Sequence, residues 1–403
     1  MTSELSELTA VGLIPKEAPA QVKKGGRPIQ VGLPKEISNQ EKRIVLTPES
    51  VGLLTNNGIQ VTVEAGAGLH AKFKDQDFAD AGAKIAYSRK EVLSSDVVLK
   101  IDAPTLEEIG EMSMGACLIS ALQIEKQDAE FIKALNEKKI TAVAFEYLED
   151  KVGGMPVVRA MSEIAGSTVM LIAAEYLSSV HDGKGLILGG VTGVPPTQVV
   201  IIGAGTVAEY AARTALGLGA NIKVFDNHIY KLRRIKQLLG QQIYTSTLDN
   251  LSLAQALAEA DVVIGALRAE KGRNKIVVSE EMVANMIHGS IIIDVAIDQG
   301  GCVETSRMTT HDEPVYKVHD IIHYCVPNIA SRVACTASYS LSNIFTPIVL
   351  QMSDLGGAEE MIFNYKWFLR GVYTYRGSLT NAYLGKKFGL THKELQLLLA
   401  ARY

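Results

Sequence analysis

The stretch that decides the fold is Val199-Val-Ile-Ile-Gly203-Ala-Gly205-Thr-Val-Ala208, an apolar run leading into the pattern G-x-G-x-x-A and a helical pattern over 209–218. Gly203 permits a tight turn, Gly205 lets the backbone approach a pyrophosphate, and the small Ala208 allows close packing of helix and strand. The partial positive charge of the helix N-terminus then faces the phosphates. This stretch predicts a dinucleotide-binding strand, turn and helix.

An acidic residue in the expected place strengthens this prediction. Asp226 ends the next apolar run, 23 residues after Gly203, where a carboxylate accepts hydrogen bonds from the ribose diol of adenosine. Such a carboxylate repels a 2′-phosphate, which favours NAD(H) over NADP(H). Lys231, Arg233 and Arg234 nearby weaken that preference. The alternative is a glycine-containing turn that binds no ligand.

Outward from this stretch, short apolar runs alternate with helical patterns along the chain. This alternation predicts an α/β fold with parallel sheets covered by helices. We expect two Rossmann-like domains, with a dinucleotide-binding domain inserted into a discontinuous substrate domain. The predicted boundaries are a flexible N-terminal extension over 1–28, a substrate domain over 29–155 and 333–403, and a dinucleotide domain over 156–332.

Several local patterns support this division. Thr47 followed by Pro48 predicts a helix start, and Ser279 before two glutamates predicts another. Long helices over 156–180 and 333–352 are expected to cross between the domains. The tail to Tyr403 is helical in pattern.

Composition excludes several classes of protein. The 403 residues are 47% hydrophobic and 21% charged with a mean hydropathy of +0.14, which excludes disorder and low complexity. A net charge of -4 argues against nucleic acid as a partner. Four cysteines without a C-x-x-C pair favour a reducing, cytoplasmic location. We also expect no membrane span, since no uninterrupted apolar run reaches about 18 residues.

Six motifs in one order resemble the L-alanine dehydrogenase family, which is related to the NAD(H)-binding subunit of the proton-translocating nicotinamide nucleotide transhydrogenase. Besides the Gly203 turn, these motifs are Arg43-Ile-Val-Leu-Thr-Pro48, Met161-Ser-Glu-Ile-Ala-Gly166, Gly189-Gly-Val-Thr-Gly-Val194, Asp294-Val-Ala-Ile-Asp-Gln-Gly-Gly301 and His319-Asp through Tyr324-Cys-Val-Pro-Asn328. The resemblance covers about residues 29–380.

The resemblance implies oxidative deamination of a small amino acid such as L-alanine to a 2-oxo acid, with NAD as cofactor and a hexameric homo-oligomer. It implies that Arg43 binds the substrate carboxylate and that Asp298 lies between the nicotinamide ribose and the substrate, as a catalytic residue. From the residues alone, Asp298 could instead be a solvated loop-tip carboxylate. The expected cofactor-binding residues are Ser162, Gly203, Gly205, Thr206, Val207, Asp226, Lys231, Leu267, Asp298, Asn328 and Ile329.

The sequence departs from the family at two positions. Asp102 stands where the family has a substrate-binding lysine, and Lys100 lies two residues earlier, on the same face of the expected strand. Gln123 stands where the family has its catalytic histidine, and an amide cannot shuttle a proton. Loss of general acid or base catalysis typically costs about 10²–10⁴-fold in rate. We expect Lys100 and Asp102 to bind substrate, although they could also form a plain ion pair.

Three interpretations follow. Other groups, such as Asp298 or Asp102, transfer the proton; the substrate is a different amino acid that uses Asp102; or the chain binds NAD(H) without deaminating anything. His70 could replace the missing imidazole, although a solvated loop histidine fits it better. We expect no metal at His319 and His323, because i, i+4 nitrogens diverge in an extended segment.

Overall fold

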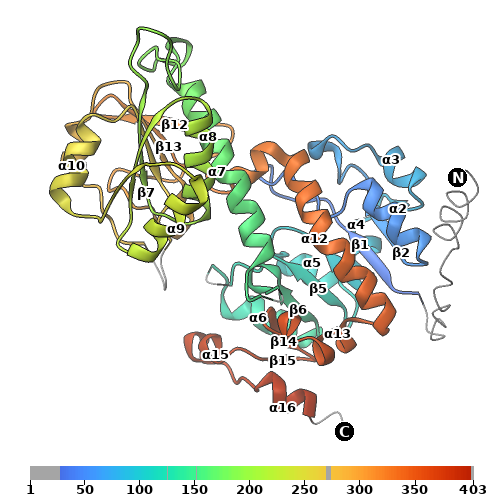
Figure 1. Cartoon of the computed structure of the whole chain (residues 1–403). Coiled ribbons are helices and arrows are strands. Elements are labelled where there is room, and N and C mark those ends of the chain that lie inside the picture. Colours follow the sequence, from blue (N-terminus) through green and yellow to red (C-terminus); the bar gives the residue numbers. More distant parts are fainter. Residues whose placement is uncertain (1–27, 125, 151, 269–273, 401–403) are drawn as a thin grey trace, which may run out of the picture.

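The computed structural model of the chain describes residues 28–124, 126–150, 152–268 and 274–400. The predicted N-terminal extension lies outside these residues, apart from Pro28. Figure 1 shows two α/β domains joined by two long helices, α7 (Pro156–Tyr176) and α12 (Ala334–Leu355). The mixed α/β architecture with two largely parallel sheets confirms the predicted fold class.

The first sheet has eight strands in the order β15-β14-β6-β5-β4-β1-β2-β3. Its strands are β1 (Gln30–Leu33), β2 (Gln60–Glu64), β3 (Lys84–Ala86), β4 (Val97–Leu99), β5 (Cys117–Ser120), β6 (Thr141–Ala144), β14 (Val372–Tyr375) and β15 (Ser378–Leu379). β1 to β6 are parallel, whereas β14 runs antiparallel to β6 and β15. The order β3-β2-β1-β4-β5-β6 is that of a doubly wound sheet.

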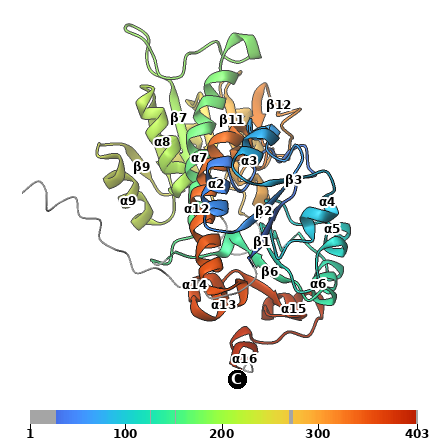
Figure 2. The same ribbon diagram turned by 90° about the vertical axis from the view of Figure 1, so that its right-hand side faces the viewer.

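Helices cover this sheet on both faces. They are α2 (Pro48–Asn56), α3 (Asp75–Asp80), α4 (Arg89–Leu93), α5 (Leu106–Glu111), α6 (Ala129–Glu137), α13 (Ala358–Asn364), α14 (Lys366–Leu369), α15 (Ala382–Phe388) and α16 (Leu395–Ala400), with the 3₁₀ turns η2 (Leu69–Ala71) and η3 (Phe145–Tyr147). Thr47 is the N-cap of α2 with Pro48 in its first turn, as predicted. Figure 2 shows α16 at the end of the molecule that lies away from the second domain.

The second sheet has seven strands in the order β12-β13-β11-β10-β7-β8-β9. They are β7 (Gln198–Ile202), β8 (Asn221–Phe225), β9 (Tyr244–Ser246), β10 (Val262–Gly265), β11 (Ile291–Asp294), β12 (Val315–Val318) and β13 (Ile321–Tyr324). All pairs are parallel except β12 with β13. β7 lies at the point where the strand order reverses, which is where such sheets bind ligands.

The remaining elements connect and cover the second sheet. They are α8 (Thr206–Gly217), α9 (Ile229–Leu239), α10 (Asn250–Ala258), α11 (Glu280–Ala284), η4 (Ser179–His181), η5 (Val295–Gln299) and η6 (Ile329–Val333). Ser279 caps α11 by accepting a hydrogen bond from the Met282 backbone, as predicted. α7 packs closely on α8 because Gly166 has no side chain: a Cβ there would lie 2.4 Å from the Val207 carbonyl oxygen.

Three sequence-based expectations about elements need correction. The tail is not wholly helical, since β14 and β15 extend the first sheet. α7 ends at Tyr176 rather than Val180, and a separate 3₁₀ turn, η4, follows. Lys100 and Asp102 do not share a strand face, because β4 ends at Leu99.

Two helices are long and apolar enough to cross a membrane, judged by length and composition alone: Pro156–Tyr176 and Ile329–Leu355. The expectation of no membrane span missed both, because polar residues such as Ser162 and Ser342 interrupt their apolar runs. About half of each apolar window is buried inside the protein. Core helices of soluble proteins have the same character, so this finding is weak support for a membrane span.

Candidate active site

The predicted dinucleotide turn has the backbone that its sequence requires. Gly203 has φ of 112°, and a Cβ there would lie 2.5 Å from the Ala266 carbonyl oxygen. A side chain at position 203 would therefore collide with the loop after β10. Gly205 is the N-cap of α8, and a Cβ there would meet no atom within 4 Å. Open space thus lies in front of the helix N-terminus, beside Thr206 and Val207, as a pyrophosphate requires.

Asp226 follows β8 and is only 3% exposed. Its Oδ2 accepts a hydrogen bond from the Ala204 N–H at 2.8 Å, and its Oδ1 accepts one from the His228 N–H at 2.7 Å. These bonds fix the carboxylate beside the glycine turn. Carboxylate oxygens have further lone pairs for a ribose diol. The geometry therefore fits the adenosine half of a dinucleotide.

Other predicted cofactor residues surround this turn. Lys231 lies in the first turn of α9, and Arg234 donates a hydrogen bond to the Ala204 carbonyl at 3.3 Å. Leu267 follows β10, and its carbonyl accepts from the Asn274 side chain. Ser162 lies half-buried in α7. The second sheet and α7 thus carry the predicted cofactor-binding residues other than Asn328 and Ile329.

Asp298 lies in η5, directly after β11, at the junction between the two domains. Its side chain is accessible to solvent, yet crowding by the surrounding protein raises the pKa of its carboxyl above the usual value. The charges of Lys126 and Arg43 and a backbone N–H of Asn328 oppose that shift. The domain junction therefore brings Asp298 near two cations of the substrate domain and near a predicted cofactor residue.

Asn328 joins the two domains directly. Its φ is 58°, in the left-handed region, and its Nδ2 donates a hydrogen bond to Glu41 Oε2 at 2.7 Å. Ile329 follows it, buried, at the start of η6. Ser331 continues this contact, because its Oγ accepts from the Lys42 N–H at 2.8 Å. The loop before α12 is thus bound to the loop that carries Arg43.

Arg43 is held by its neighbour Glu41. Arg43 Nε donates to Glu41 Oε1 at 2.7 Å, and Nη2 donates to Oε2 at 2.5 Å. Burial alone would raise the pKa of Glu41, but the charge and hydrogen bonds of Arg43 outweigh it and hold that pKa below its ordinary value. Among the described residues, Nη1 of Arg43 donates a hydrogen bond only to the Met161 Sδ, at 3.2 Å. The Nη1/Nη2 edge therefore remains suited to grip a second carboxylate.

The run of small residues in α12 positions this loop. Ser338 Oγ accepts from the Ile44 N–H at 2.9 Å, and Ser342 Oγ accepts from the Thr47 N–H at 3.0 Å. Both serines are buried. These bonds satisfy backbone groups that α2 and β1 leave free, and they fix Arg43 against the helix that links the domains.

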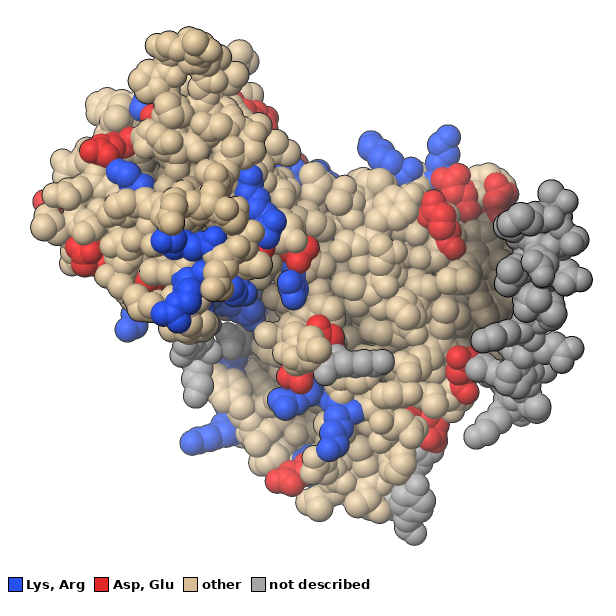
Figure 3. Space-filling view, viewed as in Figure 1, with Lys and Arg blue, Asp and Glu red and all other residues tan. Residues whose placement is uncertain are grey.

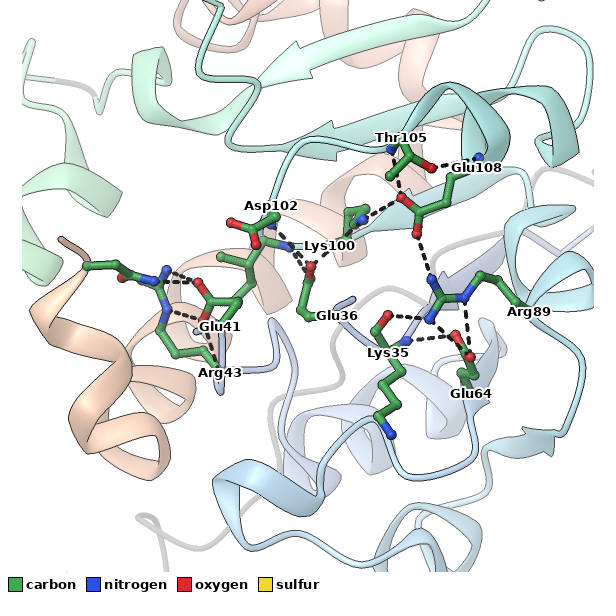
Figure 4. A network of polar contacts seen from close by, with 12 residues as sticks. Lys35, Glu36, Glu41, Arg43, Glu64, Arg89, Lys100, Asp102, Thr105 and Glu108 are labelled. Atoms are coloured by element: carbon green, nitrogen blue, oxygen red, sulfur yellow. Dashed lines mark hydrogen bonds and ion pairs between the residues drawn. The ribbon is translucent and has the colours of Figure 1, made fainter. Parts of the chain in front are cut away.

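Lys100 takes part in a buried ionic network, which Figure 4 shows. Its side chain is 2% exposed, and its Nζ lies 2.9 Å from Glu108 Oε2 and 3.8 Å from Glu36 Oε2. Glu108 also binds Arg89 and the N–H of Thr105. The expected ion pair between Lys100 and Asp102 does not form; Lys100 pairs with Glu108. The ammonium of Lys100 is therefore committed to the protein itself rather than open to a ligand.

Glu36 shares the Lys100 ammonium with a closer carboxylate. Its oxygens accept backbone N–H groups of Ile101 at 2.6 Å and Asp102 at 3.3 Å. Burial raises the pKa of Glu36 to about 8, despite the opposing charge of Lys100. One cation cannot neutralise both glutamates, and Glu108 is the nearer, so Glu36 is favoured in its protonated form at neutral pH.

Asp102 lies half-buried at the end of β4 beside this network. Burial raises the pKa of Asp102, and Glu41 adds to that shift, whereas Arg43, Lys100 and Lys126 oppose it. Among the described residues, the side chain of Asp102 forms no hydrogen bond. Asp102 therefore presents a carboxyl to the junction at the position where the family resemblance implies a lysine.

Gln123 lies in the loop after β5 with φ of 43°. Its N–H donates to Glu146 Oε1 at 2.9 Å, and its side-chain Oε1 accepts from Lys126 Nζ at 2.9 Å. Burial raises the pKa of Glu146, whose Oε2 has no hydrogen-bond partner among the described residues. Sequence reasoning missed Glu41, Met161 and Lys126, because nothing in the sequence assigns them a role: Glu41 and Lys126 contact the nearby Arg43 and Gln123, and Met161 contacts Arg43 from 118 residues away.

The histidines considered from the sequence do not form a metal site. His323 is buried, and its ring nitrogens meet Thr305 Oγ1 at 2.7 Å and the Ile321 carbonyl at 3.0 Å. His319 lies in the turn between β12 and β13 and pairs with Glu280. Within the described ranges, no group of three potential metal-ligating side chains was found. His70 is exposed in η2, outside the contacts described above.

This combination of fold and site is that of the two-domain dinucleotide-dependent dehydrogenases. The family model for the alanine dehydrogenase/PNT N-terminal domain matches residues 32–165, and the model for the C-terminal domain of the same family matches residues 169–382. The chain belongs to the alanine dehydrogenase/PNT family, as its motifs predict. Members of this family use a nicotinamide cofactor.

Individual relatives agree with this assignment. The chain is 38% identical to the alanine dehydrogenase of Mycolicibacterium smegmatis over 92% of this chain and 100% of that protein. It is 38% identical to the alanine dehydrogenase of Bacillus subtilis over 89% of this chain and 94% of that protein. A solved L-alanine dehydrogenase superposes with a TM-score of 0.84 at 35% identity, over 90% and 99% of the two chains. A transhydrogenase from Sinorhizobium meliloti shares the fold, with a TM-score of 0.76 at 24% identity over 88% and 99%.

Proposed function

We propose that this protein is an NAD-dependent amino-acid dehydrogenase that interconverts L-alanine, or a similar small amino acid, with its 2-oxo acid, ammonia and NADH. The observation that carries the proposal is the junction itself. There the Asn328 amide binds Glu41, which holds Arg43, and Asp298 lies within reach of the charge of Arg43. Residues expected to bind cofactor and substrate thus meet where the two domains touch.

In this proposal, the cofactor when bound accepts or donates the hydride at the substrate Cα. The open Nη1/Nη2 edge of Arg43 binds the substrate carboxylate, and the Glu41 and Met161 contacts fix the plane of that guanidinium. Asp298 takes up the proton released as the amine is oxidised and water adds at Cα. A carboxylate whose pKa is raised above its ordinary value suits this role better than an unshifted one, because proton transfer is most effective when the pKa lies near the working pH.

The charge of the dinucleotide domain supports an anionic cofactor. Figure 3 shows Lys and Arg side chains gathered over its lower part, the region that α9 occupies in Figure 1. α9 carries Lys231, Arg233, Arg234 and Lys236. We favour NAD over NADP because the fixed carboxylate of Asp226 occupies the place where a 2′-phosphate would need room and positive charge.

The direct test is turnover. Purified protein should oxidise NADH when given pyruvate and ammonium, and reduce NAD⁺ when given L-alanine. A panel of other 2-oxo acids and NADPH in place of NADH defines the substrate and cofactor range. Absence of turnover over the whole panel, with intact NADH binding, would reject the dehydrogenase.

One observation favours a second candidate function, an NAD(H)-binding module that passes hydride to a partner. Gln123 and Asp102 replace the histidine and lysine that the resemblance implies for the reaction, and the amide of Gln123 has no titratable proton to transfer.

The proposal of a dehydrogenase also includes a cytoplasmic location and a homo-oligomer, with a hexamer expected. Light scattering of the purified protein measures that assembly.

We expect Asp226→Ala to weaken NADH binding by about 10–100-fold, the effect of about 1.5–3 kcal/mol for hydrogen bonds to a charged group. The substitution removes the carboxylate that the Ala204 and His228 N–H groups hold beside the turn. Titration of NADH by its fluorescence measures the effect. Asp249→Ala, at the N-cap of α10, is the matched control and should leave NADH affinity unchanged. Equal affinity in both variants would mean that the ribose does not meet Asp226.

A further inference from the structure

The cations of the substrate domain near the junction differ in what neutralises them. Arg43 is paired with Glu41, and Lys100 is paired with Glu108. The Lys126 ammonium instead donates to a neutral amide oxygen, Gln123 Oε1, at 2.9 Å. Among the described residues, no carboxylate oxygen lies within ion-pair distance of Lys126 Nζ. Within the described part of the chain, no carboxylate therefore offsets the charge of Lys126.

Several hydrogen bonds hold the described residues around Lys126. The Lys126 N–H donates to the Gln123 carbonyl at 2.8 Å, and Gln127 Nε2 donates to the Leu122 carbonyl at 3.1 Å. Glu146, after the neighbouring strand β6, accepts the Gln123 N–H. These bonds connect the backbone at Lys126 to Gln123, and Gln123 to Glu146 after β6.

The segment that carries Lys126 lies at the same edge of the sheet as Asp102. β4 and β5 are adjacent and parallel, Asp102 follows β4, and the 121–127 loop follows β5. The positive charge of Lys126 acts on the carboxyls of both Asp102 and Asp298. Lys126 thus lies near enough to a carboxylate of each domain to act on both electrostatically.

The charge balance of the junction requires such a cation. Asp102 and Asp298 are both acidic, and the charge of Arg43 is offset by Glu41. A 2-oxo acid carries its own negative charge, and like charges in a partly desolvated site repel strongly. Without a further positive group, the junction would disfavour the anionic substrate that the proposed function requires.

We propose that Lys126 is a substrate-binding residue that supplies the second cationic contact to the anionic 2-oxo acid, with Arg43 as the first. This inference rests on the proposed function. The cation that binds the substrate then lies on the loop after β5, whereas Asp102 lies on the loop after β4. Gln123 acts as the positioning residue, since its amide oxygen orients the Lys126 ammonium.

The experiment compares Lys126→Met, which keeps the length but removes the charge, with Lys126→Arg, which keeps the charge. Lys133→Met, at an exposed position of α6, is the matched control. We expect Lys126→Met to raise the KM for pyruvate and the Kd for oxamate, an unreactive pyruvate analogue, by about 10–100-fold. NADH affinity and Tm should stay close to wild type, and Lys126→Arg should recover most of the affinity.

The outcomes separate this inference from the proposed function. Unchanged KM and oxamate affinity in Lys126→Met, with an active wild type, would overturn the inference and leave the function intact. A wild type that turns over no 2-oxo acid would overturn the function, and oxamate titration with NADH present would still test Lys126. A wild type that binds no oxamate, or an equal loss in Lys133→Met, would also overturn the inference.

Discussion

Replacement of Asp298 by Asn is expected to lower kcat by about 10²–10⁴-fold, the usual contribution of a general acid or base, while NADH affinity changes little. Asn keeps an oxygen that can accept the Asn328 N–H, so the local backbone contact can persist. It cannot take up a proton. Steady-state kinetics with L-alanine and NAD⁺, together with an NADH titration, separate the two quantities. Asp354→Asn, exposed on α12, is the matched control.

The pH profile gives this prediction a second readout. Crowding by the surrounding protein raises the pKa of Asp298, and only the ionised carboxylate can act as a base. Wild-type oxidation of alanine should therefore fall as the pH drops through that raised pKa. The Asn variant should lose this acidic limb as well as its rate. A variant with wild-type kcat, or one that keeps the same limb, would show that another group transfers the proton.

The sequence predicted the fold because local and tertiary signals agree there. The glycine turn after β7 needs a positive φ at Gly203, and Asp226 ends the next strand, so both features can be read from spacing. β14 was missed because Val372-Tyr-Thr-Tyr375 forms with β15 a short hairpin that lies between helices. It joins the sheet through antiparallel pairing with β6, more than 200 residues earlier, and local pattern carries no trace of such a partner.

The site was predicted less completely, for a physical reason. Arg43, Asp298 and Asn328 stand in motifs, and the structure brings them to one junction. What each side chain binds depends on residues far away in the sequence: Asn328 reaches Glu41, 287 residues earlier, and Ser342 caps the Thr47 N–H. Lys100 illustrates the limit. Its place two residues before Asp102 suggested a ligand-binding role, but its ammonium pairs with Glu108 in the first turn of α5.

Lys100→Met is therefore expected to act on stability before it acts on binding. Removal of one partner from a buried ion pair leaves an uncompensated charge and typically costs about 3–5 kcal/mol. Here it leaves Glu108 with Arg89 alone and removes the cation within ion-pair distance of Glu36, in a network that is 2% exposed at Lys100 and Glu108. Denaturant unfolding of the variant and of the control Lys133→Met measures the loss of unfolding free energy.

The pH dependence of that loss identifies its cause. Without Lys100, the ionised form of Glu36 becomes less favourable in the folded state, so the folded pKa of Glu36 rises further above that of the unfolded chain. A carboxyl with a raised folded pKa favours the folded state below its unfolded pKa and loses that contribution as the pH rises through the folded value. Burial already raises the pKa of Glu36 to about 8 in the wild type. The difference between Lys100→Met and wild type should therefore be largest at high pH and shrink as the pH falls toward 5. A difference that stays constant with pH would instead point to lost packing of the lysine stem. A stable variant with a raised KM would show that Lys100 binds the substrate.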